Sequence, residues 1–302
     1  MPQKFYSNGK LLLSGEYAVL DGAKAWAIPT KFGQYLQVSK NDSGFMTWKS
    51  TDDQDLVWFE AIYQKDNLTE VSSSNSKVSR TLLQILSEAR KMNSGFLSDS
   101  DGFEIEAKLT FPRDWGLGSS STLINNIAEW AQVDAFQLLW NAFSGSGYDI
   151  ACAKNNSPIV YQLENGLPIV KEIDTKPLFS NSLYFVYLNK KRNSRDAINA
   201  YRQRKIDKSI LVKKISDLTT EMISCSQIGE FQQLIDMHEA ILSQALGVAT
   251  IKEELFADFK GSIKSLGAWG GDFILATGGD GTPTYFKKKG YHTVIPFQEM
   301  IL

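Results

Sequence analysis

Three short stretches of the sequence combine glycine with residues that can bind or transfer a phosphoryl group. The central one is Arg113-Asp114-Trp115-Gly116-Leu117-Gly118-Ser119-Ser120-Ser121-Thr122. Glycine lets backbone N–H groups converge on an anion, and serine hydroxyls can bind phosphate or magnesium. The stretch predicts an anion site, most often a phosphate site. An ordinary loop with a serine helix cap is the alternative, because short motifs also occur by chance.

The neighbouring residues place this turn between a strand and a helix. Residues 103–111 have the pattern of a strand and end at Pro112, whereas residues 123–131 have the pattern of a helix. A helix N-terminus adds unpaired N–H donors and the positive end of the helix dipole. The turn is not a Walker P-loop, because no Gly-Lys-Ser/Thr follows, and it lacks the third glycine of the dinucleotide fingerprint.

A second glycine-rich turn, residues 144–153, carries Gly147 and Asp149. Asp134 is a plausible N-cap for a helix over residues 134–143. Two short helices would therefore separate the two turns, and a helical hairpin would return Asp149 close to the phosphate turn.

Two further stretches contain charged residues beside short apolar strands. Residues 9–22 place Lys10 and Glu16 on either side of a buried strand at residues 11–13, where both could be solvated strand ends. Residues 264–273 form a third glycine-rich turn before a strand at 273–277. A basic segment, residues 189–195, follows a strand at 182–188, and it is either a solvated loop or an anion site.

The rest of the chain alternates strands and helices. We expect strands at 25–29 and 35–38, a hairpin at 46–59 with Trp48 and Trp58 packed, and a loop at 66–77. A helix is predicted over 78–93, and residues 196–246 are expected to be mostly helical with a break at Gly229. His238 is expected to be a core or surface residue of that region rather than a ligand.

Composition excludes several classes of protein. The chain has 302 residues, 43% of them hydrophobic and 22% charged, with a net charge of -2. This is an ordinary soluble balance, and nothing in it favours nucleic-acid or membrane partners. Cys152 and Cys225 are too few for a disulfide framework or a zinc site, which predicts reduced thiols and a cytoplasmic location. The N-terminal residues lack the apolar core of a signal peptide, and no apolar run reaches the ~18 residues of a membrane span.

The order of the three turns resembles the GHMP kinases, the superfamily of galactokinase, homoserine kinase, mevalonate kinase and phosphomevalonate kinase. Residues 9–20, 112–121 and 264–272 look like the first, second and third motifs of that superfamily, and they span nearly the whole chain. The resemblance implies an α+β fold in two domains. Residues 1–176 would form an N-terminal domain like the ribosomal protein S5 second domain, and residues 177–302 a ferredoxin-like C-terminal domain.

Within the superfamily the chain looks most like phosphomevalonate kinases of the mevalonate pathway of isoprenoid biosynthesis. The resemblance is carried by residues 15–20, residues 145–151 and Gly270-Gly271-Asp272. The basic segment falls where those enzymes bind substrate, and a phosphorylated acceptor would need such cations. Mevalonate kinase, homoserine kinase, a sugar kinase and diphosphomevalonate decarboxylase remain alternatives, as does a non-catalytic nucleotide or metabolite sensor on the same fold.

The resemblance also implies roles for individual residues in transfer of phosphoryl from ATP, with Mg²⁺, to a small acidic substrate. Asp149 and Lys10 would be catalytic, with Lys10 paired to Asp149 and to the transferring group. The residues expected to bind the nucleotide are Gly116, Leu117, Gly118, Ser119, Ser120, Ser121, Gly267, Ala268, Gly270 and Gly271, with Ser120 also a metal ligand. The residues expected to bind substrate are Glu16, Tyr17, Gly147, Lys191, Arg192, Ser194 and Arg195. Such an enzyme would be a monomer or a homodimer.

Three features depart from the family pattern. Trp269 stands in place of a glycine in the third motif, which would stiffen that loop or cover part of the site. Gln137 and Leu138 lie where mevalonate kinases carry a magnesium-binding glutamate, and Glu129 is the nearest candidate. The chain is also short for a phosphomevalonate kinase.

Overall fold

The structure is a computed structural model that describes residues 2–98, 101–174, 177–191 and 194–302. The chain packs into two compact units. Unit 1 consists of Met1–Gly9, Phe32–Arg113 and Leu117–Lys154, and unit 2 of Lys10–Lys31, Asp114–Gly116 and Asn155–Leu302. The predicted domains 1–176 and 177–302 stay a prediction, because their boundary at residue 176 lies outside the described residues.

A twisted sheet forms one side of unit 1. Its strands are β1 (Gln3–Ser14), β2 (Ala25–Asn41), β3 (Phe45–Thr51), β4 (Val57–Gln64), β5 (Thr69–Ser73) and β6 (Gly102–Leu109). The order across the sheet is β5-β4-β3-β6-β2, and β1 pairs with β2. The β3–β6 pair is parallel, whereas β4 pairs antiparallel with β3 and β5, and β2 with β6. β1 and β2 are long enough to run from one unit into the other.

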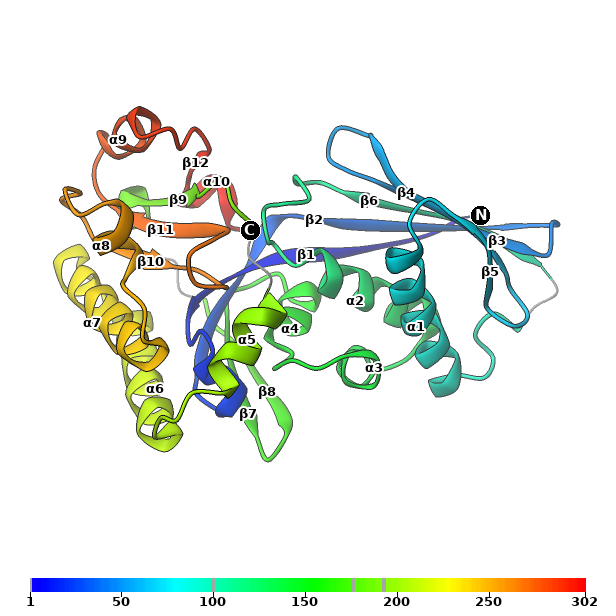
Figure 1. Cartoon of the computed structure of the whole chain (residues 1–302), viewed down its shortest axis with the longest axis horizontal. Coiled ribbons are helices and arrows are strands. Elements are labelled where there is room, and N and C mark those ends of the chain that lie inside the picture. The colour runs from blue at the N-terminus through cyan, green and yellow to red at the C-terminus, as the bar shows by residue number, and fades with distance from the viewer. Residues whose placement is uncertain (1, 99–100, 175–176, 192–193) are drawn as a thin grey trace. The chain divides into compact units, whose positions relative to one another are not determined.

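Helices cover one face of this sheet (Figure 1). They are α1 (Ser76–Met92), α2 (Ser119–Ala131), α3 (Ala135–Ala142) and α4 (Tyr148–Lys154). Alternate residues of the strands point into the core, such as Trp48 in β3, Phe59 in β4 and Ile105 in β6. This period of two is that of a sheet with one buried face. The core therefore lies between the sheet and α1, α2 and α3.

Unit 2 contains a hairpin and a small sheet. β7 (Ile159–Glu164) and β8 (Leu167–Glu172) form the hairpin, and β7 also pairs with residues 25–27 of β2. The small sheet has the order β10 (Ile263–Ser265), β11 (Phe273–Thr277), β9 (Leu183–Tyr187) and β12 (Val294–Pro296), with all neighbours antiparallel. Every residue of β9 and β11 is buried, as expected for strands covered on both faces.

The helices of unit 2 include a long antiparallel pair, α6 (Lys208–Ser224) and α7 (Ile228–Leu246), which lie side by side (Figure 1). α7 also contacts β10, and α6 contacts the 3₁₀ turn η1 (Ala18–Asp21). The remaining helical elements are α5 (Ser194–Arg202), α8 (Ile251–Leu255), α9 (Thr282–Lys288), α10 (Phe297–Met300) and the 3₁₀ turn η2 (Ser180–Ser182).

Local sequence signals place several helix starts correctly. Asp134 caps α3, where its carboxylate accepts a hydrogen bond from the Gln137 N–H at 2.8 Å. The helix predicted over 78–93 is α1, which starts two residues earlier at an Asn75 cap. Both caps use a short polar side chain to satisfy N–H groups that have no partner within the helix. The hairpin expected at 46–59 is β3–β4, and Trp48 is buried in it while Trp58 is half-buried.

The strands predicted at 25–29 and 35–38 are confirmed, although both belong to one strand, β2. Gly33 interrupts the apolar pattern between the two segments without forming a turn. A Cβ at this position would lie 2.3 Å from the Ser7 carbonyl oxygen, so glycine allows β1 to approach closely. The loop predicted at 66–77 is wrong, because these residues contain β5 and the first residues of α1. β5 is an exposed edge strand, and polar residues are common on such edges.

The helical region also breaks at a different place from the one predicted. Gly229 lies in the first turn of α7, and the interruption falls at residues 225–227, between α6 and α7. Glycine costs little near a helix start, where the backbone is not yet fully hydrogen-bonded. The pattern of apolar residues gave no sign of the β8 strand, whose residues are all exposed or half-buried.

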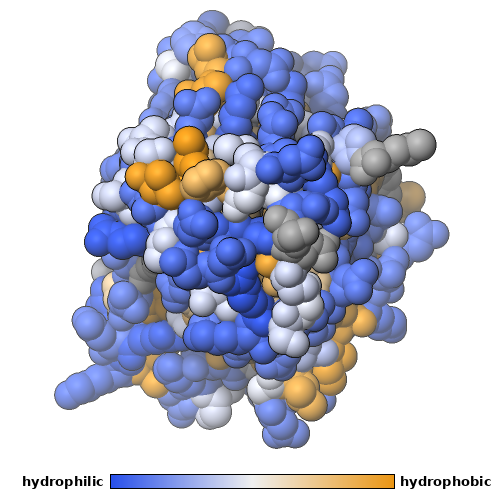
Figure 2. Space-filling model, turned by 90° about the vertical axis from the view of Figure 1, so that its right-hand side faces the viewer, coloured by the Kyte–Doolittle hydropathy of each residue, from blue (hydrophilic) through white to orange (hydrophobic). Residues whose placement is uncertain are grey.

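Charged and polar residues dominate the surface seen in Figure 2, where hydrophobic residues appear in small separate groups. Among the described residues, no helix has an apolar stretch long enough to cross a membrane.

Candidate active site

The predicted phosphate turn enters unit 1 at the N-terminus of α2. Gly118 is the N-cap residue, with a left-handed backbone at φ 91°, and no side chain caps the helix. The Ser121 hydroxyl donates to the Gly118 carbonyl at 2.8 Å, so it is used within the turn. Ser120 is exposed. The structure thus presents an uncapped helix N-terminus with one outward serine, which is the arrangement that an anion site needs.

Asp149 lies in the first turn of α4, where it is half-buried. Gly147 precedes the helix with φ 92°, a conformation that favours glycine. α4 packs against α2 within unit 1. The second glycine-rich turn therefore does lead into a helix that contacts the phosphate-turn helix, as the predicted hairpin required.

Lys10 belongs to unit 2, on the part of β1 that the strand shares with that unit. Its Nζ donates to the Gly116 carbonyl oxygen at 3.4 Å. Gly116 has φ 67°, and a Cβ there would lie 2.4 Å from the Asp272 carboxylate. Unit 2 thus brings together Lys10 of the first motif, Gly116 of the second and Asp272 of the third.

An aromatic contact and a hydrogen bond hold the segment Asp114–Gly116 within unit 2. Trp115 packs edge-on against Phe273, with ring centroids 5.3 Å apart. The Tyr187 hydroxyl donates to the Asp114 carboxylate at 2.9 Å. Burial, the bond to Asp114 and the charges of Asp114 and Asp272 raise the pKa of Tyr187, so this hydroxyl stays a donor at neutral pH.

The third motif is a well-anchored loop. Gly267 and Gly270 have positive φ of 72° and 82°. The Trp269 backbone N–H donates to the Tyr17 hydroxyl oxygen at 2.9 Å, and its indole N–H donates to the Ala249 carbonyl at 3.0 Å. Trp269 is therefore bonded to two other segments of unit 2. That it stiffens the loop or covers part of the site stays a prediction.

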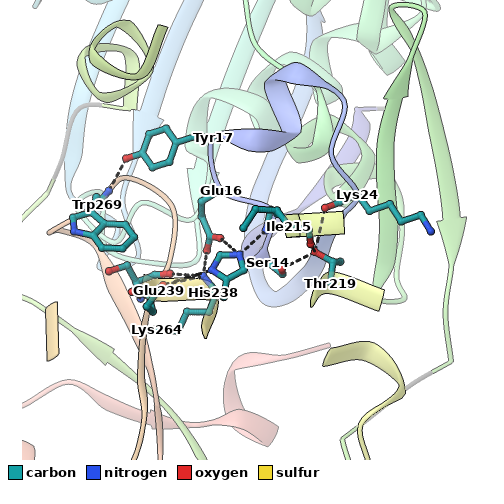
Figure 3. Close-up of polar contacts among 12 residues, drawn as sticks. Ser14, Glu16, Tyr17, Lys24, Ile215, Thr219, His238, Glu239, Lys264 and Trp269 are labelled. Atoms are coloured by element: carbon teal, nitrogen blue, oxygen red, sulfur yellow. Dashed lines mark hydrogen bonds and ion pairs between the residues drawn. The ribbon is translucent and has the colours of Figure 1, made fainter. Parts of the chain in front are cut away.

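A buried ionic cluster that the sequence did not reveal joins the first motif to the third (Figure 3). Lys264 in β10 donates to the Glu16 carboxylate at 2.6 Å and to the Glu239 carboxylate at 3.4 Å. The side chains of Lys264, Glu16 and Glu239 are 0%, 1% and 3% exposed. The only signal of this cluster in the sequence was a lysine between Ile263 and Ser265, in a strand whose residues are all buried.

His238 completes the cluster from α7. Its Nε2 accepts a hydrogen bond from the Gly15 N–H at 3.3 Å and lies 3.5 Å from the Glu16 carboxylate. Burial and the nearby Lys264 charge lower the pKa of His238 to about 3, against the opposing effect of Glu16. The imidazole is therefore neutral, which agrees with Nε2 acting as an acceptor. Of the two alternatives expected for His238, core or surface, the structure shows a core residue.

No protein-family model and no curated protein matches the sequence. Solved structures match over nearly the whole chain. Mevalonate kinase from Methanococcus jannaschii matches with a TM-score of 0.68 and 14% identity, over 96% of this chain and 94% of that one.

Two further solved structures that match are of kinases named for other substrates. Streptococcus pneumoniae phosphomevalonate kinase, solved in complex with phosphomevalonate and AMPPNP, matches with a TM-score of 0.69 and 15% identity over 95% of both chains. Lactococcus lactis galactokinase, solved with galactose, matches with a TM-score of 0.69 and 14% identity over 98% of this chain and 94% of that one. The chain has the GHMP kinase fold.

The GHMP kinase fold confirms the predicted α+β architecture. Of the residues predicted to bind nucleotide or to act as acid or base, Leu117, Ser119, Ser120 and Asp149 belong to unit 1. Lys10, Glu16, Tyr17 and the third loop belong to unit 2. The predicted pairing of Lys10 with Asp149 stays a prediction.

The basic segment is only partly described. Lys191 is exposed, Arg192 lies outside the described residues, and so do the side chains of Ser194 and Arg195 at the start of α5. Their binding of substrate stays a prediction.

Glu129 is wrong as a magnesium ligand beside Ser120. The two residues lie nine positions apart on α2, which at the helical rise separates their backbones by about 13 Å. The Glu129 carboxylate instead accepts from the Asn125 amide at 2.9 Å. In the part of the chain that the structure describes, no three His, Cys, Asp or Glu side chains are grouped to hold a metal ion.

Proposed function

We propose that this chain is an ATP-dependent kinase that transfers a phosphoryl group to an oxygen of a small acidic metabolite. The observation that carries the proposal is the uncapped N-terminus of α2, with Gly118 in the left-handed conformation and Ser120 exposed. Backbone N–H groups at such a terminus, with the positive end of the helix dipole, fit the phosphates of a nucleotide. The GHMP kinase fold supports the same reading.

The roles of the residues follow from the physics of phosphoryl transfer, which is mainly positioning and charge stabilisation. The backbone of residues 116–121 would hold the ATP phosphates, and the Ser120 hydroxyl would be a ligand of magnesium. Mg²⁺, when bound, neutralises charge on the phosphate oxygens. Lys10 would stabilise the transferring group, and Asp149 would accept or orient the proton of the attacking oxygen. If the acceptor is itself a phosphate, Asp149 would orient that oxygen instead of deprotonating it.

Phosphomevalonate is the acceptor that we propose first, for an enzyme of the mevalonate pathway. Lys190 and Lys191 are exposed directly after β9, at the start of the basic segment. Cations there suit a phosphorylated acceptor better than a neutral one. The fold does not distinguish one acceptor from another, because a mevalonate kinase matches with a TM-score of 0.68 and a phosphomevalonate kinase and a galactokinase each match with 0.69. We further propose a cytoplasmic monomer or homodimer that needs no nucleic acid or membrane.

The test is ADP release from ATP and magnesium, with phosphomevalonate, mevalonate, homoserine and galactose offered separately. Turnover with phosphomevalonate alone is the expected result. Turnover with mevalonate would retain the mechanism and make the basic segment a solvated loop. Binding of ATP without turnover of any acceptor would favour a sensor, and absence of ATP binding would refute the proposal.

A further inference from the structure

Two adjacent residues of the first motif contact two separate points of the third. Glu16 reaches Lys264, which is the first residue of that motif, at 2.6 Å. Tyr17 reaches Trp269, five residues further on, where its hydroxyl oxygen accepts the backbone N–H at 2.9 Å. All four residues belong to unit 2. Figure 3 shows both contacts, with the Tyr17–Trp269 bond above the Glu16–Lys264 pair.

The contact through Glu16 lies in a fully enclosed polar cluster. Glu239 accepts from the Ser265 N–H at 3.0 Å as well as from Lys264, and His238 accepts from the Gly15 N–H. His238 therefore bonds to the backbone of Gly15, directly before Glu16, and Glu239 bonds to the backbone of Ser265, directly after Lys264. Buried charges are held in a single geometry, because any shift leaves one of them without a partner.

The position of the Tyr17 side chain is also fixed by its backbone conformation and its packing. Tyr17 has a positive φ of 59° and is 8% exposed, and its ring packs against Tyr201 with centroids 5.5 Å apart. A non-glycine residue in this backbone region is strained, and the strain persists only where surrounding contacts impose it. The direction of the Tyr17 side chain is thus fixed by packing before it meets Trp269.

We propose that Glu16 and Tyr17 are positioning residues that hold the third loop in its nucleotide-binding shape before any nucleotide arrives. The inference rests on the proposed kinase function. It gives Tyr17 a role different from the substrate contact that the family resemblance implied, because the Tyr17 hydroxyl already bonds to the loop. A loop fixed in advance binds without the entropic cost of ordering residues 266–272.

The decisive variant is Tyr17→Phe, which removes one hydroxyl and leaves the ring packing intact. Without its acceptor, the Trp269 N–H should open about tenfold more often, which corresponds to a loss of about 1.4 kcal/mol for this part-buried hydrogen bond. Hydrogen exchange of residues 266–272 in the nucleotide-free protein should accelerate by that factor. The Kd for AMPPNP with magnesium should rise about threefold to tenfold, and the KM for the acceptor should not change.

Tyr63→Phe is the matched control. Tyr63 is fully buried, and its hydroxyl donates to the Ser79 hydroxyl at 3.0 Å within unit 1. This control should lose a similar amount of stability without altering exchange of residues 266–272 or AMPPNP binding.

Three results would overturn the proposal. Unchanged exchange of residues 266–272 in Tyr17→Phe would show that Tyr17 does not hold the loop. Faster exchange with unchanged AMPPNP affinity would show that the loop shape does not matter for the nucleotide. A raised KM for the acceptor with unchanged exchange would return Tyr17 to substrate binding.

Glu16 is tested by a graded pair of variants. Glu16→Gln keeps an oxygen that can accept from Lys264, whereas Glu16→Ala leaves Lys264 with the Glu239 carboxylate at 3.4 Å and the Ser265 carbonyl oxygen at 3.0 Å. Exchange should be fastest in Glu16→Ala and be largely restored in Glu16→Gln, and equal effects would contradict positioning by this bond. If the wild-type protein bound no AMPPNP at all, the proposed function would fail and the nucleotide step with it, while exchange would still report whether the two contacts hold the loop.

Discussion

The start of α2 in unit 1 and the cluster around Lys264 in unit 2 arrange polar groups in opposite ways. At α2, backbone N–H groups and an exposed serine come from residues that are adjacent in the sequence. In the cluster, side chains from residues 16, 238, 239 and 264 meet out of contact with water. The first arrangement can bind and release a ligand, whereas the second can only hold the chain. Substitutions should therefore affect activity at one place and folding at the other.

Asp149→Ala should show the largest effect on activity. Removal of a group that accepts or orients a proton typically costs about 10²- to 10⁴-fold in rate. Because Asp149 is only half-buried, the thermal midpoint should change little. The kcat with the best acceptor and the melting temperature are the two measurements.

The matched control for Asp149→Ala is Asp53→Ala, which removes an exposed carboxylate between β3 and β4. It should leave both kcat and melting temperature unchanged. A kcat for Asp149→Ala within a few-fold of the wild type would show that Asp149 is not the base.

Lys264→Met should show the converse pattern, with a large loss of stability. It leaves Glu16 and Glu239 buried without their cation, and breaking a buried ion pair on one side costs about 3–5 kcal/mol. The free energy of unfolding in urea measures this loss.

Adding Glu16→Gln to Lys264→Met tests whether the loss arises from the pair. The double variant should be more stable than the sum of the single losses predicts, because the second change removes an unpaired charge. Strict additivity would mean that Lys264 and Glu16 do not stabilise each other.

The same contrast explains what the sequence could predict. The turn at residues 116–121, the Asp134 cap and the strand at residues 182–188 are local patterns, and they were identified from neighbouring residues alone. The Glu16–Lys264 pair joins residues 248 positions apart, and Glu239 sits in a helix whose apolar pattern shows only which face is buried. Which charges meet in the core depends on how α7 and β10 pack, and no periodicity encodes that.

Gly116→Ala should have an intermediate effect that tests the junction between the motifs. A Cβ at Gly116 would overlap the Asp272 carboxylate at 2.4 Å in addition to straining the positive φ. Strain alone costs about 1–2 kcal/mol, and the overlap should add to it. Urea unfolding and AMPPNP affinity should both show the loss.

Gly166→Ala provides the control for strain without overlap. Gly166 has φ 77°, and a Cβ there would meet nothing within 4 Å. The difference between the two variants isolates the contact with Asp272. Equal losses would mean that Asp272 moves aside freely and does not fix Gly116.

The last expected effect is the pH dependence that His238 gives to the stability of the cluster. A pKa of about 3 in the folded protein, against an ordinary value near 6.5, means that the unfolded chain binds a proton that the folded chain does not. Stability from this residue is complete above pH about 6.5 and falls as pH drops toward 3, by up to about 1.4 kcal/mol per pH unit.

Glu239 has the opposite effect on how stability depends on pH, so the contribution of His238 must be measured as a difference between two proteins. Burial raises the pKa of Glu239, so its contribution is present at low pH and is lost as pH rises through the raised value. Glu16, Glu239 and Lys264 are present in both the wild type and His238→Gln, so their contributions cancel in the difference between the two proteins. The unfolding free energy of the wild type minus that of His238→Gln should therefore rise with pH between 5 and 6.5, because only the histidine has been removed. A flat difference would mean that the imidazole is protonated inside the cluster, and the Gly15 N–H would then have lost its acceptor.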